Sequence, residues 1–309
     1  MGVSNTAVDQ RDQSQAPKSG VTSRGQAAGG LLMVLSALGF ATNPILGKFA
    51  YQAGANAITL GMVRFSTAAT VLVLYLAIQG RLGGLTVAKR LKLMILGAGG
   101  VAMVALLYFT ALMHINASLA TGLFYCYPAM VAVAGLFRGE ALTSSKLAGL
   151  ALTIAGTWLL LGDDLGGFSW QGVFLILASA VVYTGYLLMS DRWADNVAPD
   201  VASAHVITGA AIVYLVLEAS LRSPLPHLQA YFSGAGLAFS STILALITLY
   251  AGMARVGPTR AAIISTLEPV FTAIMALLLL GERLGVLQVV GIALVVFGAV
   301  AAQWRPESR

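Results

Sequence analysis

The sequence predicts an all-α membrane protein whose ten transmembrane helices form two inverted five-helix repeats, with both termini in the cytoplasm. Of the 309 residues, 58% are hydrophobic and 10% are charged, whereas charged residues make up about a quarter of a soluble domain. Apolar runs long enough to cross roughly 30 Å of hydrocarbon recur along the whole chain. A pattern of glycine, proline and polar residues also occurs twice, once in each half.

The apolar runs define the expected spans. Residues 1–27 are rich in Gln, Ser, Gly and Asp without an apolar period, so we expect a disordered cytoplasmic tail there. Ten apolar runs follow, at residues 29–49, 58–79, 91–113, 117–137, 145–161, 170–190, 201–221, 231–254, 259–280 and 285–303. We assign the first five to a repeat at 28–162 and the last five to a repeat at 163–304. The short linkers leave no room for an extramembrane catalytic domain.

The positions of Lys and Arg predict the orientation. With the N-terminus inside, 14 of these residues flank the cytoplasmic ends of the spans. The outer ends hold three, namely Lys48, Arg222 and Arg283, and Arg64 lies within the second span. Because cytoplasmic loops of membrane proteins are enriched in Lys and Arg, both termini are predicted to lie in the cytoplasm.

The internal repeat has a nearly constant offset. Gly139-Glu140, Gly149 and Gly156 recur 142 residues later as Gly281-Glu282, Gly291 and Gly298, and Tyr127-Pro128 faces Glu268-Pro269 at an offset of 141. Ser36, Phe40, Asn43 and Gly47 recur 143 residues later as Ser179, Tyr183, Tyr186 and Ser190. Each half holds an odd number of spans, so the second half enters the membrane in the opposite orientation. Inverted repeats of this kind are typical of alternating-access secondary transporters.

Several of these motifs carry a resemblance to a known family. The run Glu268-Pro269-Val270, then Leu280-Gly281-Glu282, Gly291, Leu294 and Gly298, resembles the C-terminal signature of the EamA-type exporters of the drug/metabolite transporter superfamily. A weaker copy in the first half and Arg64-Phe65 early in the second span are similar to the same family. The stretch Phe124-Tyr125-Cys126-Tyr127-Pro128 looks most like bacterial amino-acid exporters of the YddG type. The resemblance implies export of aromatic and other amino acids.

Polar and aromatic residues inside the spans are the candidate binding residues. A cavity lined by rings and hydroxyls, with few fixed charges, suits a small zwitterion with an apolar side chain. The candidates are Phe40, Asn43, Tyr108, Phe124, Tyr125, Tyr127, Tyr183, Tyr186, Tyr250, Ser265 and Glu268. Pro128 and Pro269 interrupt the fourth and ninth spans, so we expect both to act as hinges for gating.

Charges within the membrane are costly and are therefore functional candidates. Glu268 is interpreted either as a protonatable or ammonium-binding carboxylate, or as a structural residue paired with an Arg or a helix end. Arg64 is interpreted as a structural charge that snorkels outward or pairs with Glu218. The chain shows no HExxH motif, no Ser/His/Asp grouping and no cluster of residues with metal-ligand spacing. We therefore expect no enzyme, no metal and no cofactor.

These observations favour a secondary transporter that exports amino acids across the bacterial inner membrane by alternating access through a central cavity. A broad multidrug or metabolite exporter is the alternative. A channel is also compatible with the sequence. The expected partners are amino-acid substrates and the lipid bilayer, with no nucleic acid. The protein is expected to be a monomer or a weak homodimer.

Overall fold

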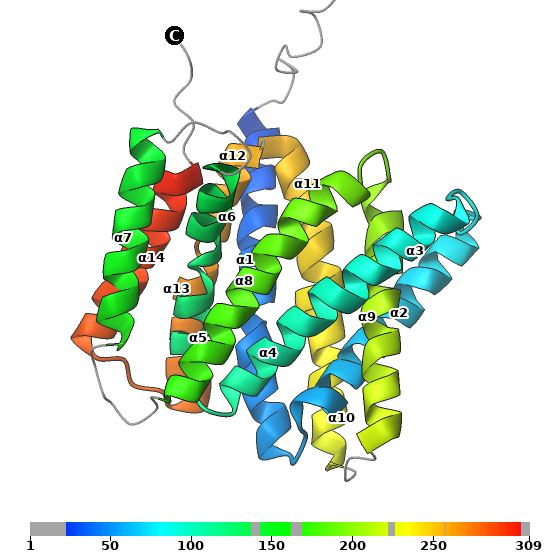
Figure 1. Ribbon diagram of the computed structural model, residues 1–309, viewed down its shortest axis with the longest axis horizontal. Helices are drawn as coiled ribbons and strands as arrows, with labels where there is room; N and C mark the ends of the chain where they lie inside the picture. Colours follow the sequence, from blue (N-terminus) through cyan, green and yellow to red (C-terminus); the bar gives the residue numbers. More distant parts are fainter. Residues whose placement is uncertain (1–22, 137–142, 162–168, 222–225, 257, 304–309) are drawn as a thin grey trace, which may run out of the picture.

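Helices account for all the regular structure in the part of the chain that the computed structural model describes, residues 23–136, 143–161, 169–221, 226–256 and 258–303 (Figure 1). The α-helices are α1 (Ser23–Gln52), α2 (Ala57–Ile78), α3 (Val87–Leu96), α4 (Ala102–Leu112), α5 (Ala117–Phe124), α6 (Tyr127–Leu136), α7 (Ser144–Leu161), α8 (Trp170–Trp193), α9 (Pro199–Leu221), α10 (Leu228–Leu237), α11 (Ala245–Val256), α12 (Pro258–Ser265), α13 (Glu268–Met275) and α14 (Val286–Gln303). Three π-helical segments, η1 (Gly97–Val101), η2 (Ala238–Leu244) and η3 (Ala276–Leu280), continue α3, α10 and α13.

The lengths and apolar compositions of the helices match those of membrane-spanning segments. Among the described residues, eight helical stretches are long and apolar enough to cross a membrane, including Val87–Leu112 through η1 and Leu228–Val256 through η2. Two further apolar helices are shorter, Leu147–Leu160 within α7 and Val286–Ala301 within α14. A helix of about 20 apolar residues spans the hydrocarbon core. The chain is therefore a multi-pass membrane protein.

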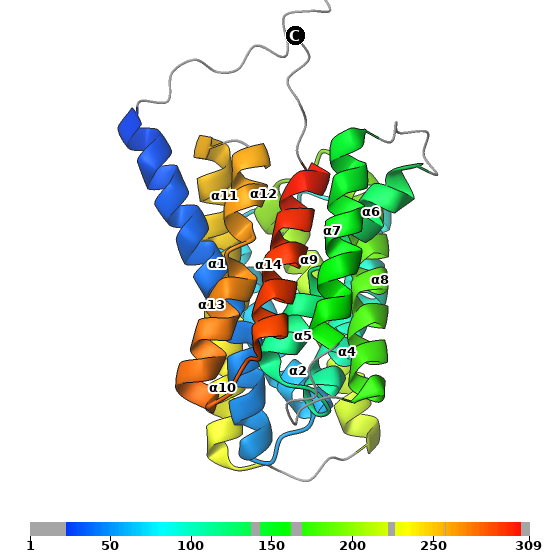
Figure 2. The same ribbon diagram turned by 90° about the vertical axis from the view of Figure 1, so that its left-hand side faces the viewer.

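The bundle has two distinguishable ends. Helix α1 begins and α14 ends at the same end, at the top of Figures 1 and 2, which we call the terminal end; the opposite end is the far end. Helix α1 extends from the terminal end to the far end and packs against α10, η2, α11 and α13. Elsewhere in the bundle, α2 packs against α9, α4 against α8, and α7 against α14. Elements far apart in the sequence are thus neighbours throughout the bundle.

The first helix begins earlier than the sequence analysis predicted. Residues 23–27 were assigned to the disordered tail, but α1 already starts at Ser23. Gln26, Ala27 and Ala28 are good helix formers, so they extend the apolar helix toward the terminal end. The rest of the predicted tail lies outside the described residues.

The fourth and ninth predicted spans are each broken into two helices. Helix α5 ends at Phe124 and α6 starts at Tyr127, while α12 ends at Ser265 and α13 starts at Glu268. Pro128 and Pro269 each lie in the first turn after a break, where a missing N–H leaves no intrahelical hydrogen bond unmade. The breaks therefore precede the prolines instead of coinciding with them.

The backbone at both breaks remains hydrogen-bonded. The amide of Cys126 donates to the Leu123 carbonyl at 3.1 Å, and the amide of Leu267 donates to the Ile264 carbonyl at 3.0 Å. These are three-residue bonds, which tighten a helix end. Because hydrocarbon offers no alternative partner, such local bonds are what allow an interrupted helix within a membrane.

Glycines bring α7 and α14 into close contact. A Cβ added to Gly156 would lie 2.7 Å from the carbonyl oxygen of Gly291, and a Cβ on Gly298 would lie 2.8 Å from that of Gly149. The two helices run in opposite directions, as Figure 2 shows. Small residues permit backbones to approach this closely in membranes, where van der Waals packing drives helix association. We call this contact the glycine seam.

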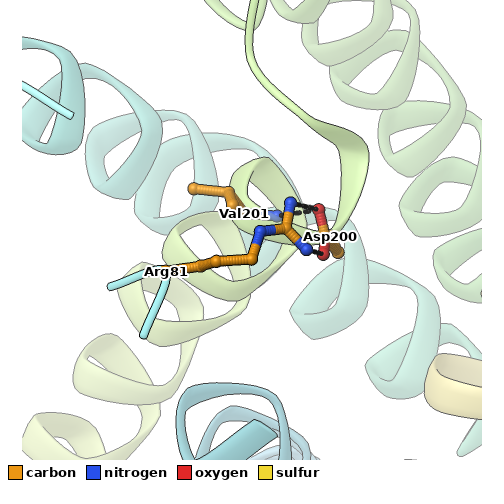
Figure 3. Close-up of polar contacts among 3 residues, drawn as sticks. All are labelled: Arg81, Asp200 and Val201. Carbon is orange, nitrogen blue, oxygen red and sulfur yellow. Dashed lines mark hydrogen bonds and ion pairs between the residues drawn. The ribbon is translucent and has the colours of Figure 1, made fainter. Parts of the chain in front are cut away.

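An ion pair joins α9 to the segment after α2. The guanidinium of Arg81 makes two contacts with the carboxylate of Asp200, of which the Nη2–Oδ1 contact is 3.0 Å, and Asp200 also accepts a hydrogen bond from the Val201 amide (Figure 3). The Arg81 side chain is 40% exposed. Exposed pairs contribute at most about 1 kcal/mol, so this one adds little to stability.

The glycine seam predicts a sharp difference between two similar substitutions. Gly156→Ala forces a methyl group against the α14 backbone, and overpacking of this kind costs about 1–3 kcal/mol. Thermal unfolding of the detergent-purified protein should show a lower midpoint. Gly185→Ala in α8 is the control, because nothing lies within 4 Å of its added Cβ, and it should unfold at or above the parent midpoint. Equal midpoints for the two variants would contradict the close contact.

Candidate functional site

A central cavity of about 490 Å³ lies between helices of both halves of the chain. Its walls come from α1, α2, η1, α4, α8, α9, η2 and α11, and from the two helix breaks. Among the described residues that line it, two carry a charge: Arg64 on α2 and Glu268 at the start of α13. Its size is within the usual range of small-molecule pockets.

The structure brings the sequence-predicted binding residues into this one cavity. All eleven line it: Phe40 and Asn43 on α1, Tyr108 on α4, Phe124 at the end of α5, Tyr125 and Tyr127 at the first break, Tyr183 and Tyr186 on α8, Tyr250 on α11, and Ser265 and Glu268 at the second break. Pro128 and Pro269 are not among the lining residues. The candidates therefore share a location, although they come from both halves of the sequence.

The rings form a continuous wall. The ring centroids of Tyr108 and Phe124 are 5.4 Å apart, those of Phe124 and Tyr183 are 5.3 Å apart, and those of Tyr127 and Tyr183 are 4.9 Å apart. Tyr186 stacks beside Tyr183 at 5.9 Å. Aromatic pairs at 4.5–7 Å stabilise one another beyond the area that they bury. The wall is thus a packed structure that also presents ring faces to the cavity.

Glu268 is tied to the opposite break. The Tyr125 hydroxyl lies 2.9 Å from the Glu268 carboxylate and 2.9 Å from the carbonyl oxygen of Ser265. Tyr125 follows α5 and Glu268 starts α13, so this contact holds the two interrupted helices together. The side-chain hydroxyl of Ser265 donates to the Ala261 carbonyl of its own helix. Glu268 is the acidic residue of the described cavity lining.

Arg64 does not have the partner that the sequence analysis considered. Its Nη1 donates to the Asn43 side-chain oxygen at 2.9 Å, and its Nε donates to the Thr242 hydroxyl at 3.1 Å. Glu218 instead accepts the hydroxyl of Thr59 at 3.1 Å. Thr59 precedes Arg64 by more than one helical turn of α2, or about 7 Å along its axis. Of the two interpretations of Arg64, outward snorkelling or pairing with Glu218, the contacts of the described residues do not include the pair.

Sequence reasoning missed part of the cavity wall. Ser241 and Thr242 of η2, Ser203 of α9 and Phe109 of α4 line the cavity as well. The run Ser240-Ser241-Thr242 within an apolar span was a signal for the first two. Nothing local distinguishes Phe109 from a packing residue. It reaches the cavity beside Arg64 of α2 and Gly47 of α1, which are contacts between distant parts of the chain.

A polar contact joins the two halves at the far end. The Glu282 carboxylate accepts hydrogen bonds from the Ala117 amide at 2.7 Å, the Ser118 amide at 3.1 Å and the Ser118 hydroxyl at 2.9 Å. A carboxylate at the start of α5 satisfies unpaired helical N–H groups and matches the helix dipole. Close by, Lys48 donates to the Ile115 carbonyl at 2.7 Å. We call these contacts the far-end tie.

The cavity extends away from the far-end tie. Its lining includes Ser190 near the end of α8 and Ser203 near the start of α9, both toward the terminal end. The residues of the far-end tie are not part of that lining. Glu140, the sequence counterpart of Glu282, lies outside the described residues. Within the described ranges, no group of three His, Cys, Asp or Glu residues has the arrangement of a metal site.

The Tyr125–Glu268 contact predicts a matched pair of substitutions. Tyr125→Phe removes the hydroxyl that reaches Glu268 and Ser265, and leaving a buried acceptor without its donor costs about 1–3 kcal/mol. The unfolding midpoint of the purified protein should fall. Tyr250→Phe is the control, because in the described part of the chain no hydrogen bond of the Tyr250 hydroxyl occurs. A Tyr125→Phe midpoint equal to that of Tyr250→Phe would show that the contact carries no stability.

The chain is similar in sequence to known bacterial transporters and in fold to a solved structure. The chain is 27% identical over 299 residues to YcbK, an uncharacterized transporter of Bacillus subtilis, covering 91% of this chain and 95% of that protein. An uncharacterized transporter of Synechocystis is 27% identical over 216 residues, covering 65% of this chain and 63% of that one. A solved crystal structure superposes with a TM-score of 0.66 at 20% identity, covering 89% of this chain and 96% of the other. That likeness shows the fold alone.

The family assignment rests on a match that extends over most of the sequence. The sequence profile of the EamA-like transporter family matches residues 27–162 and again residues 170–302. Together these ranges cover well over half of the chain. The protein is a multi-pass membrane transporter, not an enzyme, and it belongs to the EamA-like transporter family of the drug/metabolite transporter superfamily.

Proposed function

We propose that this transporter exports amino acids, among them aromatic and other small neutral ones, through the central cavity. The observation that carries the proposal is the composition of the cavity wall, which combines a continuous set of aromatic rings, several hydroxyls, one acid and one base. A neutral zwitterion needs one partner for each charge and an apolar surface for its side chain. The described lining offers all three.

The rings favour an apolar or aromatic side chain. The faces of Tyr127, Tyr183 and Phe124 supply rigid area at low entropic cost. Glu268 is the partner that we assign to the substrate ammonium group, and neighbouring rings add cation–π attraction for it. A phosphate-rich substrate fits poorly, because Arg64 is the cavity's single described base.

Recurring geometry supports ten spans arranged as two inverted repeats. The bounds of α7 and α14 differ by 142 residues at both ends, and the breaks before Tyr127 and Glu268 differ by 141. The π-helical segments η1 and η2 occur at equivalent places. The glycine seam agrees, because Gly156 meets Gly291 as Gly298 meets Gly149. The family profile also matches once in each half.

Charge distribution supports cytoplasmic termini. The terminal end of the bundle holds Arg81, Lys89, Arg90 and Lys92, which lie between the end of α2 and the first turns of α3. The positive-inside rule then assigns this end to the cytoplasm. The relatives belong to bacteria, so we assign the protein to the bacterial inner membrane.

This arrangement supports alternating access. With the terminal end in the cytoplasm, a cavity that extends toward Ser190 and Ser203 and away from Glu282 corresponds to an inward-facing state. The outward-facing state requires the far-end tie to open. The breaks at Tyr125 and Thr266 supply the flexible points, because few helical hydrogen bonds cross them.

Counterflow in proteoliposomes tests the substrate. We expect radiolabelled phenylalanine and threonine to exchange with unlabelled amino acid, with saturation. Glu268→Gln should reduce that exchange by about tenfold or more, the effect of losing a charge-assisted contact. Tyr127→Ala should reduce it by a similar factor, because it removes aromatic surface that the substrate side chain would contact. A lipophilic cation serves as the competing substrate. Exchange of the cation without exchange of either amino acid would assign the protein to the broad multidrug exporters instead. Non-saturable flux would indicate a channel.

Cross-linking tests the far-end tie. Ser118→Cys and Glu282→Cys, introduced together after Cys126→Ala has removed the single native cysteine, should react with a short bifunctional thiol reagent, because the parent side chains are in hydrogen-bond contact. Bridging should stop substrate exchange, and cleavage of the bridge should restore it. Each single-cysteine variant, treated in the same way, is the control and should keep its activity. Undiminished exchange in the bridged protein would mean that this end does not open during transport.

A further inference from the structure

We propose that Arg64 is the anchor for a carboxylate group of the transported molecule. The inference rests on the proposed function and names the chemical group that the substrate presents to this part of the cavity. It reverses the interpretation of Arg64 as a purely structural charge. Substrates would therefore be carboxylates that also carry an apolar part, and lipophilic amines without a carboxylate would be excluded.

The first argument is that Arg64 has neutral partners. Its two hydrogen bonds go to Asn43 and Thr242, neither of which carries a charge. In the described part of the chain, the one ion pair between an arginine and a carboxylate is that of Arg81 and Asp200, outside the cavity. A guanidinium has five N–H donors, so three remain for a ligand. Arg64 thus faces the cavity with an uncompensated charge.

The second argument is the energy of that charge. An isolated ion in a low-dielectric site is strongly disfavoured unless it is paired. The rings of Phe65 and Phe109 lie 5.1 and 5.7 Å from the guanidinium carbon and attract it by cation–π interaction. That attraction is smaller than the desolvation cost of burying an ion. An anionic ligand supplies the missing compensation.

The third argument is shape. The planar guanidinium presents two parallel N–H groups that match the two oxygens of a carboxylate. Asn43 on α1 and Thr242 on η2 hold it from two sides, and Ser241 contacts the same Asn43 oxygen at 3.5 Å. These contacts fix the orientation of the guanidinium N–H groups before a ligand binds. Fixed donors bind more tightly, because less freedom is lost on binding.

The choice of a carboxylate over a phosphate follows from the rest of the lining. A phosphate group carries up to two charges and is usually met by more than one cation or by a helix N-terminus. Arg64 is the single basic residue of the described lining, and Glu268 in the same cavity repels anions of higher charge. A singly charged group beside an apolar body fits both facts.

Three related probes test the anchor. Phenylalanine carries both charged groups, 3-phenylpropionate lacks the ammonium, and phenethylamine lacks the carboxylate. Binding to the purified parent protein is measured from ligand-dependent thermal stabilisation. We expect phenylalanine and 3-phenylpropionate to stabilise the protein, and phenethylamine, which keeps the contacts to Glu268 and the rings but lacks the group for Arg64, to stabilise it much less. Stabilisation by phenethylamine equal to that by phenylalanine would overturn the proposal.

The variants assign the effect to Arg64. Arg64→Gln should weaken binding of both carboxylates by about tenfold or more, the loss expected for a charge-assisted contact. Arg81→Gln removes an arginine outside the cavity and should bind like the parent. If Arg64→Gln does not fold, Arg64→Lys keeps the charge but loses the two parallel N–H groups, and it should weaken binding of both probes at least several-fold. Carboxylate binding unchanged in either folded variant would overturn the proposal.

The two proposals fail in different ways. If 3-phenylpropionate binds in an Arg64-dependent manner but no amino acid exchanges in counterflow, the anchor stands and amino-acid export is wrong. If phenylalanine exchange persists at the parent rate in Arg64→Gln, export stands and the anchor is wrong. The paired measurements therefore separate them.

Discussion

The structure depends on one constraint, which is that hydrocarbon offers no hydrogen-bond partner to an exposed backbone group. A bundle of unbroken helices would meet that constraint, but the wall of its cavity would have no point at which to bend. Within the described spans, the irregular backbone lies at a few places: the breaks at Tyr125-Cys126 and Thr266-Leu267, and the π-helical segments. Both breaks and η1 and η2 contribute residues to the central cavity. Departure from regular helix thus occurs where the polar lining and local bonds compensate for it.

The charged residues of the cavity must meet two opposing requirements. Its charged residues, Arg64 and Glu268, must be stable in a low-dielectric setting, yet must leave donors and acceptors for a ligand. Neutral side chains meet the first requirement in part, since Asn43 and Thr242 orient Arg64 and Tyr125 orients Glu268 without cancelling either charge. Had Arg64 and Glu268 paired with each other, the two charges would compensate one another without a ligand, but neither would remain to recognise one.

Much of this fold could be predicted from the sequence, because each helix that crosses a bilayer must be a long apolar run. Apolar runs predicted the helical stretches, and rings and hydroxyls within them predicted residues that share one cavity. Other features depend on contacts between distant segments and were not predictable. The partners of Arg64 come from α1 and η2, and Glu218 lies more than a turn away in depth. The breaks were predicted only approximately, since proline indicates where a helix restarts and not where the preceding one ends.

The glycine seam has one further consequence. Its two contacts are the same contact made twice, with Gly156 against Gly291 and Gly298 against Gly149. A surface with this property is self-complementary in the antiparallel direction, as in an isologous dimer interface. If the two halves are the inverted repeats proposed above, an ancestral chain of half this length would have carried its own partner surface. Gene duplication and fusion would then have turned an association between two molecules into a contact within one.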